Sequence, residues 1–218
     1  MRVLTLASAS PRRRELLERA GLLVRVLPAP VDEEPLGGEN AIGYVKRLAR
    51  EKASAGVRRI AAALGNDPRS AGDEPPRWVL AADTVVTVDE LLLGKPSDVA
   101  EARAMIERLE GREHCVVTGF ALLDLERNKE GIQAVTTRVR FKPMSRAEIE
   151  TYLAAGESMD KAGAYAIQGV GAYLVEEIVG SYTNVVGLPV AQVCAMLEEM
   201  GAWDLLPYPT AASRRPIL

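Results

Sequence analysis

The order of apolar and polar residues predicts strands and helices that alternate along most of the chain. Short apolar runs at 3–7 and 24–27 have the length of buried strands, and a helix that opens at Pro11 lies between them. From 41 to about 63, apolar residues recur at helical spacing, so a long amphipathic helix is expected there. The pattern places Lys52 on the solvated face of that helix.

The middle of the chain is expected to form the longest strands. The segment 78–88 is apolar on both sides of Asp83, which interrupts it, and 91–93 can return as a hairpin. Two further runs, 114–125 and 132–142, have the length of long strands. The second of them alternates apolar and polar residues, which predicts one packed face and one wet face.

The remaining segments complete the expected fold. They are helices that follow Asp98, Ser145 and Pro189, a glycine-rich segment at 160–171, a strand at 173–179 and a turn at 181–187. Strands that alternate with helices, around a long antiparallel pair, predict an α/β fold with a mixed sheet. The polar Pro/Gly-rich excursion 66–77 is expected to be mobile, and 207–218 is expected to be a frayed tail.

Composition narrows the class of protein. The 218 residues suit one domain, or one domain of two lobes, and the 48% hydrophobic content suits a packed core. A net charge of −3 and 5% aromatic residues argue against a nucleic-acid binder. The two cysteines, Cys115 and Cys194, offer neither a disulfide framework nor metal-ligand spacing. Because no signal peptide or membrane-spanning run is evident, we expect a cytoplasmic protein with reduced cysteines and no membrane contact.

The first candidate site is the start of the helix after the first strand. Ser10 suits the N-cap and Pro11 the first helical position, yet Arg12, Arg13 and Arg14 fill the first turn, where the helix dipole disfavours bases. Such a cluster makes sense if an anion binds there, because free N–H groups and guanidinium groups would then converge on one phosphate. The alternative is that the arginines simply extend into solvent.

Asp83 is the second candidate, because a carboxylate within an apolar strand is costly unless a cation or metal compensates it. A carboxylate that emerges at a strand end can act as a metal ligand or a general base. The alternative is a structural carboxylate in an Asx-turn or bulge. The sole histidine, His114, is expected to be an ordinary strand residue, since neighbouring Cys115 points to the opposite face.

Several other polar residues gain meaning only together. Lys52, Lys95, Glu33 and Gln168 would each, taken alone, be read as surface or loop residues. Together with the arginines and Asp83, these residues supply cations and oxygen ligands. Such a set of functional groups is typical of phosphoryl or nucleotidyl transfer with Mg²⁺ or Mn²⁺. The Walker lysine motif and the kinase motifs are absent.

Six segments, in order within about residues 1–206, resemble the Maf family. They are Ser8-Ala-Ser-Pro-Arg-Arg-Arg-Glu-Leu-Leu, Ala82-Asp-Thr-Val-Val, Gly94-Lys-Pro, 109–119, Asp160-Lys-Ala-Gly-Ala-Tyr-Ala-Ile-Gln-Gly and 180–189. The resemblance implies a nucleoside triphosphate pyrophosphatase that cleaves between the α- and β-phosphates with a divalent metal. It implies a fold similar to the inosine-triphosphate pyrophosphatases, with a long mixed sheet, flanking helices and two lobes around a cleft. The domain would span 1–206, followed by a tail.

The resemblance also implies roles for individual residues. The motifs are those of the branch that prefers dTTP and UTP, in which Asp83 matches the proton acceptor and Arg12, Thr84 and Gln168 match positions that select the base. The phosphate-facing and other substrate-binding positions match Arg13, Lys52, Lys95 and Ser8. Asp83 and Glu33 match metal ligands, and Arg14 is expected to remain at the surface.

Two questions stay open at this level. The family name comes from septum formation, so a nucleotide-sensing regulator of cell division without essential turnover is the alternative function. The presence of both the arginine site and Asp83 favours an enzyme, because a sensor would not need the carboxylate. The resemblance leaves a homodimer open.

Overall fold

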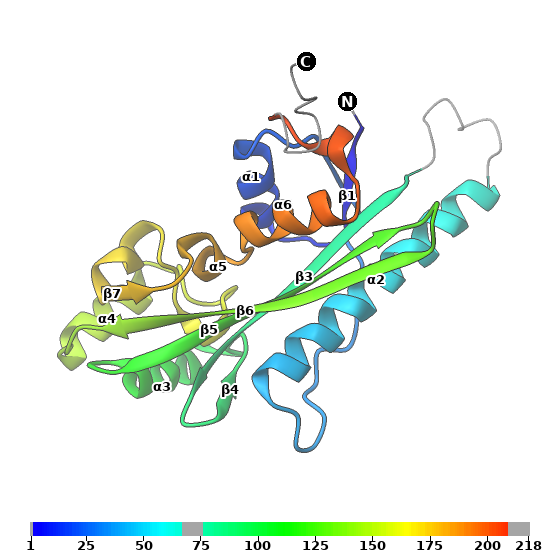
Figure 1. Ribbon diagram of the computed structural model, residues 1–218. Coiled ribbons are helices and arrows are strands. Elements are labelled where there is room, and N and C mark those ends of the chain that lie inside the picture. The colour runs from blue at the N-terminus through cyan, green and yellow to red at the C-terminus, as the bar shows by residue number, and fades with distance from the viewer. Residues whose placement is uncertain (1, 67–75, 209–218) are drawn as a thin grey trace, which may run out of the picture.

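The structure is a computed structural model that describes residues 2–66 and 76–208 (Figure 1). Most of the expected excursion at 66–77 and of the expected tail at 207–218 lies outside the described residues. No described helix combines the length and the apolar character needed to cross a membrane.

The described strands form one mixed sheet of seven. They are β1 (Leu4–Leu6), β2 (Val24–Val26), β3 (Trp78–Val88), β4 (Leu91–Leu93), β5 (Glu113–Asp124), β6 (Lys129–Phe141) and β7 (Val175–Val179). Their order is β2-β1-β3-β5-β6-β7, and β4 pairs with β3 outside this path. β1 runs parallel to both β2 and β3, whereas the other pairs are antiparallel. The predicted α/β fold with a mixed sheet is therefore confirmed.

Helices and short 3₁₀ segments lie between these strands and after the last of them. They are α1 (Pro11–Arg19), α2 (Ala41–Asn66), α3 (Val99–Leu109), α4 (Arg146–Ala154), α5 (Tyr182–Val186) and α6 (Val190–Glu199), with the 3₁₀ segments η1 (Ala162–Ala164), η2 (Gly169–Leu174) and η3 (Trp203–Leu205). Asp98 caps α3, and Ser145 with Glu148 forms the predicted capping box of α4. The turn expected at 181–187 contains the short helix α5. The strand expected from 173 begins at Val175, because η2 takes the two residues before it.

The two faces of the sheet are covered differently. In Figure 1, α2 runs alongside the long strands, and its residues Tyr44, Val45 and Leu48 pack against Val85 and Val117. The opposite face carries two separate hydrophobic cores. One gathers residues of α1 and α6 over the start of β3, and the other gathers residues of α3 and α4 over its end.

A polar row separates these two cores. Thr84 of β3 lies directly opposite Thr118 of β5 in the antiparallel register, and their hydroxyl groups are 2.9 Å apart. On the same face of the sheet, the preceding pair, Ala82 and Phe120, belongs to the first core. The following pair on that face, Val86 and Val116, belongs to the second core. The polar row therefore divides the packing on this face of the sheet into two parts.

Helix α2 approaches the sheet unusually closely at two points. Gly119 lies opposite Asp83, and a Cβ atom on Gly119 would stand 2.4 Å from the carbonyl oxygen of Val45. Further along the helix, a Cβ atom on Gly56 would meet the Cβ atom of Ala7 at 2.9 Å. The two glycines therefore fix the distance between helix and sheet on both sides of Lys52.

Candidate active site

The site lies where the edge of β3 has no partner strand among the described residues. β1 pairs with β3 as far as Leu80, and β4 begins to pair with it at Val86. Because side chains of a strand alternate between faces, Asp83 points toward α2 and Thr84 toward the opposite face. The carbonyl oxygen of Ala82, which faces this gap, accepts a hydrogen bond of 2.7 Å from Nη1 of Arg13.

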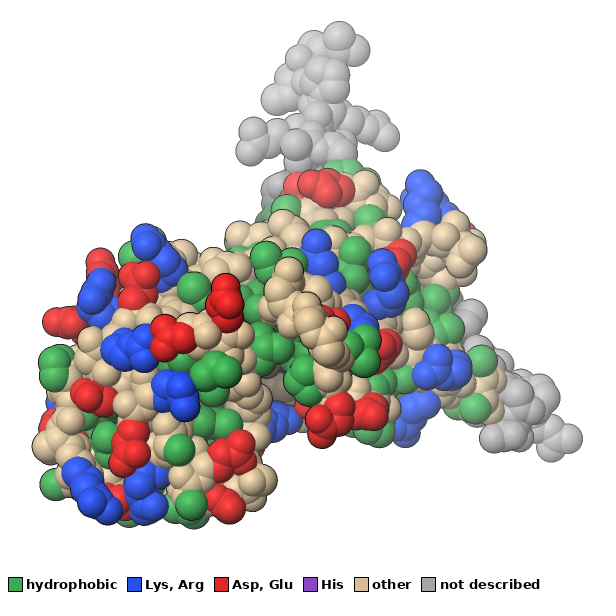
Figure 2. Space-filling model, turned by 90° about the horizontal axis from the view of Figure 1, so that it is seen from below, with side chains coloured by type: hydrophobic (Ala, Val, Ile, Leu, Met, Phe, Trp, Pro, Cys, Tyr) green, Lys and Arg blue, Asp and Glu red, His purple; other side chains and the backbone are tan. Residues whose placement is uncertain are grey.

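A cavity of about 490 Å³ opens at this gap. Seen from below, the surface is hollowed between two masses of the molecule, and positive and negative side chains are interspersed around it (Figure 2). The cavity has the size of a small-molecule ligand site. All the predicted site residues line it: Ser8, Arg12, Arg13, Glu33, Lys52, Asp83, Thr84, Lys95 and Gln168.

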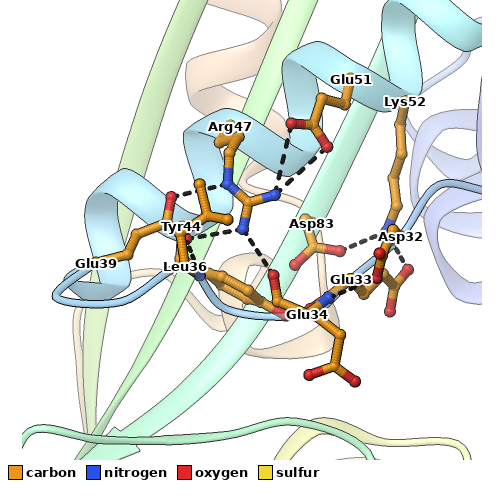
Figure 3. A network of polar contacts seen from close by, with 10 residues as sticks. All are labelled: Asp32, Glu33, Glu34, Leu36, Glu39, Tyr44, Arg47, Glu51, Lys52 and Asp83. Carbon is orange, nitrogen blue, oxygen red and sulfur yellow. Dashed lines mark hydrogen bonds and ion pairs between the residues drawn. The ribbon is translucent and has the colours of Figure 1, made fainter.

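One lysine bridges two carboxylates in the wall of this cavity. Nζ of Lys52 donates to Oδ1 of Asp83 at 2.5 Å and to Oε1 of Glu33 at 2.6 Å (Figure 3). Asp83 is 7% exposed and Lys52 8%, so each charge is buried with a partner, which offsets the loss of hydration. The helical pattern was wrong to place Lys52 on a solvated face.

The expected surroundings of Asp83 also need correction. The residue neither interrupts β3 nor stands at its end, because the ladder with β5 continues without a break through Asp83 and Gly119. It is therefore not the carboxylate of an Asx-turn or a bulge. Lys52 provides the compensating cation that a buried aspartate needs.

The loop that carries Glu33 is anchored by α2. The hydroxyl group of Tyr44 donates to the carbonyl oxygen of Glu33 at 2.8 Å, and Arg47 donates to the carbonyl oxygen of Glu34 at 3.1 Å (Figure 3). Burial, together with the charges of Asp83 and Glu33, raises the pKa of Tyr44 to about 12, so its hydroxyl remains a donor. Burial acts to raise the pKa of Glu33, but the hydrogen bond and charge of Lys52 outweigh it and lower that pKa.

Arg13 is fastened to the protein by most of its N–H groups. It donates to Gly187 O at 2.9 Å, Ala82 O at 2.7 Å, Ser8 Oγ at 3.2 Å and Thr84 Oγ1 at 3.1 Å. A guanidinium group has five N–H donors, so these bonds leave little for a ligand. Burial lowers the pKa of Arg13 from 12.5, and the group remains a cation at neutral pH.

The other two arginines of α1 behave differently from each other. Nη2 of Arg12 reaches Oδ2 of Asp160 at 3.3 Å and so links α1 to the glycine-rich segment across the cavity. Arg14 is exposed and pairs with Glu18 at 2.7 Å, as expected of a surface residue. Ser10 occupies the N-cap position, but its side chain makes no capping hydrogen bond.

Sequence reasoning missed the polar row behind the cavity. Thr118 and Asn184 are both fully buried, and the Thr118 hydroxyl donates to Asn184 O at 3.3 Å. Nδ2 of Asn184 donates to Val116 O and to Oγ1 of Thr137, both at 3.0 Å. The available signal was a polar residue within an apolar strand run, the same signal that pointed to Asp83.

His114 is a strand residue, as expected, and the structure shows that it is buried. Its Nε2 lies 2.8 Å from the hydroxyl oxygen of Tyr165, and both rings pack edge to face with Phe141. Burial lowers the pKa of His114 to about 4, so the ring is neutral at neutral pH. Because Tyr165 lines the cavity, this aromatic cluster supports its floor.

The carboxylate pair fits a divalent cation. Oxygens of Asp83 and Glu33 already converge on one positive atom, and carboxylate oxygens are ligands that Mg²⁺ and Mn²⁺ prefer. The described residues contain no cluster of three or more His, Cys, Asp or Glu side chains that could hold a metal ion. Oxygens from a substrate or from water would have to complete the coordination.

Comparisons with known proteins show the family of this chain. The family model described as "Maf-like protein" matches residues 3–200, and the chain belongs to this family. A relative from Geobacter sp. (strain M21), named "dTTP/UTP pyrophosphatase", is 49% identical over 91% of this chain and 96% of its own length. A relative of the same name from Myxococcus xanthus (strain DK1622) is 48% identical over 97% of both chains. The family recognised from the sequence motifs is confirmed.

Proposed function

We propose that this protein hydrolyses nucleoside triphosphates, with dTTP and UTP preferred, to the nucleoside monophosphate and pyrophosphate. The observation that carries the proposal is the cluster of the buried residues Lys52 and Asp83 with the exposed Glu33, in the wall of a cavity that also holds Arg12 and Lys95. The names of the relatives, "dTTP/UTP pyrophosphatase", support the same reaction. We infer a role in clearing unwanted nucleotides from the cellular pool.

In this mechanism a water oxygen attacks the α-phosphorus, and the bond from that phosphorus to the bridging oxygen breaks. Asp83 accepts the proton of the water on a carboxylate oxygen. Lys52 and Lys95 neutralise the charge that develops on the departing pyrophosphate, with Arg13 adding positive charge from its fixed position. Asp83 and Glu33 would hold Mg²⁺ or Mn²⁺, which supplies further charge neutralisation.

Base selection is assigned to the other side of the cavity. Gln168 has both a donor and an acceptor on one amide, which suits a pyrimidine edge, and Arg12 and Thr84 lie in the same cavity. A base with mismatched donors and acceptors would leave polar groups of Gln168, Arg12 and Thr84 unpaired. An unpaired, partly buried polar group costs more binding free energy than the loss of one contact. Ser8 contributes through its hydrogen bond with Arg13.

The test is pyrophosphate release from a panel of nucleoside triphosphates with Mg²⁺ or Mn²⁺. We expect dTTP and UTP to be the best substrates, and Asp83→Asn to abolish release while nucleotide binding survives. The matched control is Asp89→Asn, an exposed hairpin aspartate that pairs with Arg112, which should retain activity. Comparable turnover by Asp83→Asn would contradict its assigned role. Absence of turnover on every nucleotide would favour the non-hydrolysing regulator, which the names of the relatives do not favour.

A further inference from the structure

Lys52 stands where a divalent cation would bind. Its Nζ atom lies 2.5 Å from an oxygen of Asp83 and 2.6 Å from an oxygen of Glu33. Mg²⁺ holds its oxygen ligands at about 2.1 Å, so an ion shared by the same two oxygens would occupy nearly the same point. The ammonium group and a metal ion therefore cannot both be held by these two oxygens.

The burial of Lys52 and Asp83 strengthens the competition between the ammonium group and a divalent ion. Lys52 is 8% exposed and Asp83 is 7% exposed, so solvent screens the repulsion between an ammonium and a divalent ion only weakly. With Lys52 in place, its single positive charge already offsets one of the two carboxylate charges, and its ammonium group occupies the point between them. A metal ion arriving alone would have to displace Lys52 and leave an ammonium group buried without a partner.

We propose that Lys52 is the resident cation of the free enzyme, and that the metal ion reaches Asp83 and Glu33 when a triphosphate draws Lys52 away from them. The inference rests on the proposed function, because it takes a nucleoside triphosphate as the ligand. Metal and nucleotide then bind with positive coupling: the phosphates offer new partners for Lys52 and the missing oxygen ligands for the metal. By linkage, each ligand strengthens the binding of the other by the same factor.

The fold makes Lys52 the cation that can move. Arg13 is tied to four acceptors, two of them backbone carbonyl groups. Among the described residues Lys52 is held only by its two ion pairs, and it has a long flexible side chain. The helix beneath it is held close to the sheet at Gly119 and at Gly56. The movement is therefore confined to the side chain, which can swing from the carboxylates toward the phosphates without any shift of α2.

The test measures Mn²⁺ binding by electron paramagnetic resonance, with and without thymidine 5′-(α,β-imido)triphosphate, in which the scissile bond is blocked. In the wild-type chain the analogue should tighten Mn²⁺ binding by about 5–150-fold, the usual range of such coupling. Lys52→Met should tighten Mn²⁺ binding to the nucleotide-free protein by about tenfold or more, and the coupling to the analogue should shrink. The matched control is Lys95→Met, which removes a charge from the same cavity without touching Asp83 and should give a smaller gain.

The outcomes separate this inference from the proposed function. A gain in Lys52→Met no larger than that in Lys95→Met overturns the inference. Failure to release pyrophosphate from dTTP or UTP would overturn the proposed function and leave the comparison of nucleotide-free proteins intact, because that comparison needs no turnover.

A second measurement uses the wild-type chain, in case Lys52→Met does not fold. In protein labelled with ¹⁵N-lysine, Mg²⁺ alone should leave the Nζ resonance of Lys52 in place, whereas Mg²⁺ with the analogue should shift it. A shift with Mg²⁺ alone, equal to that with both ligands, overturns the inference.

Discussion

Gly119→Ala is expected to disable the enzyme without altering any group that touches the substrate. The added Cβ atom would stand 2.4 Å from the carbonyl oxygen of Val45 and 2.9 Å from the backbone nitrogen of Lys46. Contacts below 3.0 Å essentially never occur at real Cβ atoms, and ordinary contact begins at 3.4 Å. Because both atoms belong to the backbone, no side-chain rotation relieves the overlap, and α2 must retreat by about 1 Å.

The magnitude follows from that displacement. Overpacking of this kind costs about 1–3 kcal/mol of the free energy of unfolding, which lowers Tm by about 2–4 °C for each kcal/mol in a chain of this size. Lys52 lies about two turns further along the same helix, so the backbone that carries it is displaced and its Nζ atom no longer reaches the positions proposed for it in the cavity. A misplacement of about 1 Å can reduce the rate about 10²-fold, and we expect kcat to fall by that order.

The assay pairs pyrophosphate release from dTTP with a thermal melt. The control is Gly43→Ala in α2 itself, where the nearest atoms to an added Cβ lie at 3.4 and 3.5 Å. Alanine is the better helix former, so this control should keep its activity and gain up to about 1 kcal/mol of stability. Wild-type kcat in Gly119→Ala would refute the reasoning, since it would show that the spacing between α2 and the sheet does not position Lys52.

Three further outcomes are expected. Burial lowers the pKa of His114 from 6.5 to about 4, so the unfolded chain binds this proton at higher pH than the folded chain. The free energy of unfolding should therefore fall by about 3 kcal/mol as pH drops from about 6.5 to about 4, and urea titrations of His114→Gln should lack this component. Thr118→Val should cost about 1–3 kcal/mol in chemical denaturation, because it removes the two hydrogen bonds that the buried Thr118 hydroxyl makes with Thr84 Oγ1 and Asn184 O, and Thr118→Ser should recover most of the loss. Gln168→Ala should change the ratio of kcat/KM between dTTP and CTP by about 10–200-fold and should alter the Mg²⁺ requirement much less. An equal loss of activity on every nucleotide would contradict the role of Gln168 in base selection.

The sequence predicts local features well where one face of an element is packed. The alternation of β6 is confirmed, because Thr137, Val139 and Phe141 are buried while Arg138 and Arg140 are exposed.

The burial of Lys52 was missed, although the sequence carried a signal for it. Lys52 follows Leu48 by one helical turn and so stands on the apolar stripe of α2, but a lysine there is read as solvated unless its partner is known.

The partners themselves are what the sequence could not supply. Lys52 meets a carboxylate 31 residues away, and Arg13 donates to carbonyl oxygens 69 and 174 residues away. Motif resemblance gathered the site residues without showing which of them bind one another. Their individual roles, the choice between Mg²⁺ and Mn²⁺, a homodimer and a cytoplasmic location stay predictions.

The alternation of β3 has a consequence for how such enzymes can diversify. Asp83 and Thr84 are neighbours in the chain, yet the sheet separates the carboxylate–lysine cluster on one face from Arg13, Thr84 and Thr118 on the other. On the roles proposed for Thr84, Asp83 and Lys52, substitutions that alter base preference can therefore accumulate on one face while the carboxylate–lysine cluster on the other is inherited unchanged. A single-residue insertion in β3 would exchange the two faces and destroy both functions at once, so this strand should tolerate substitutions but not changes of length.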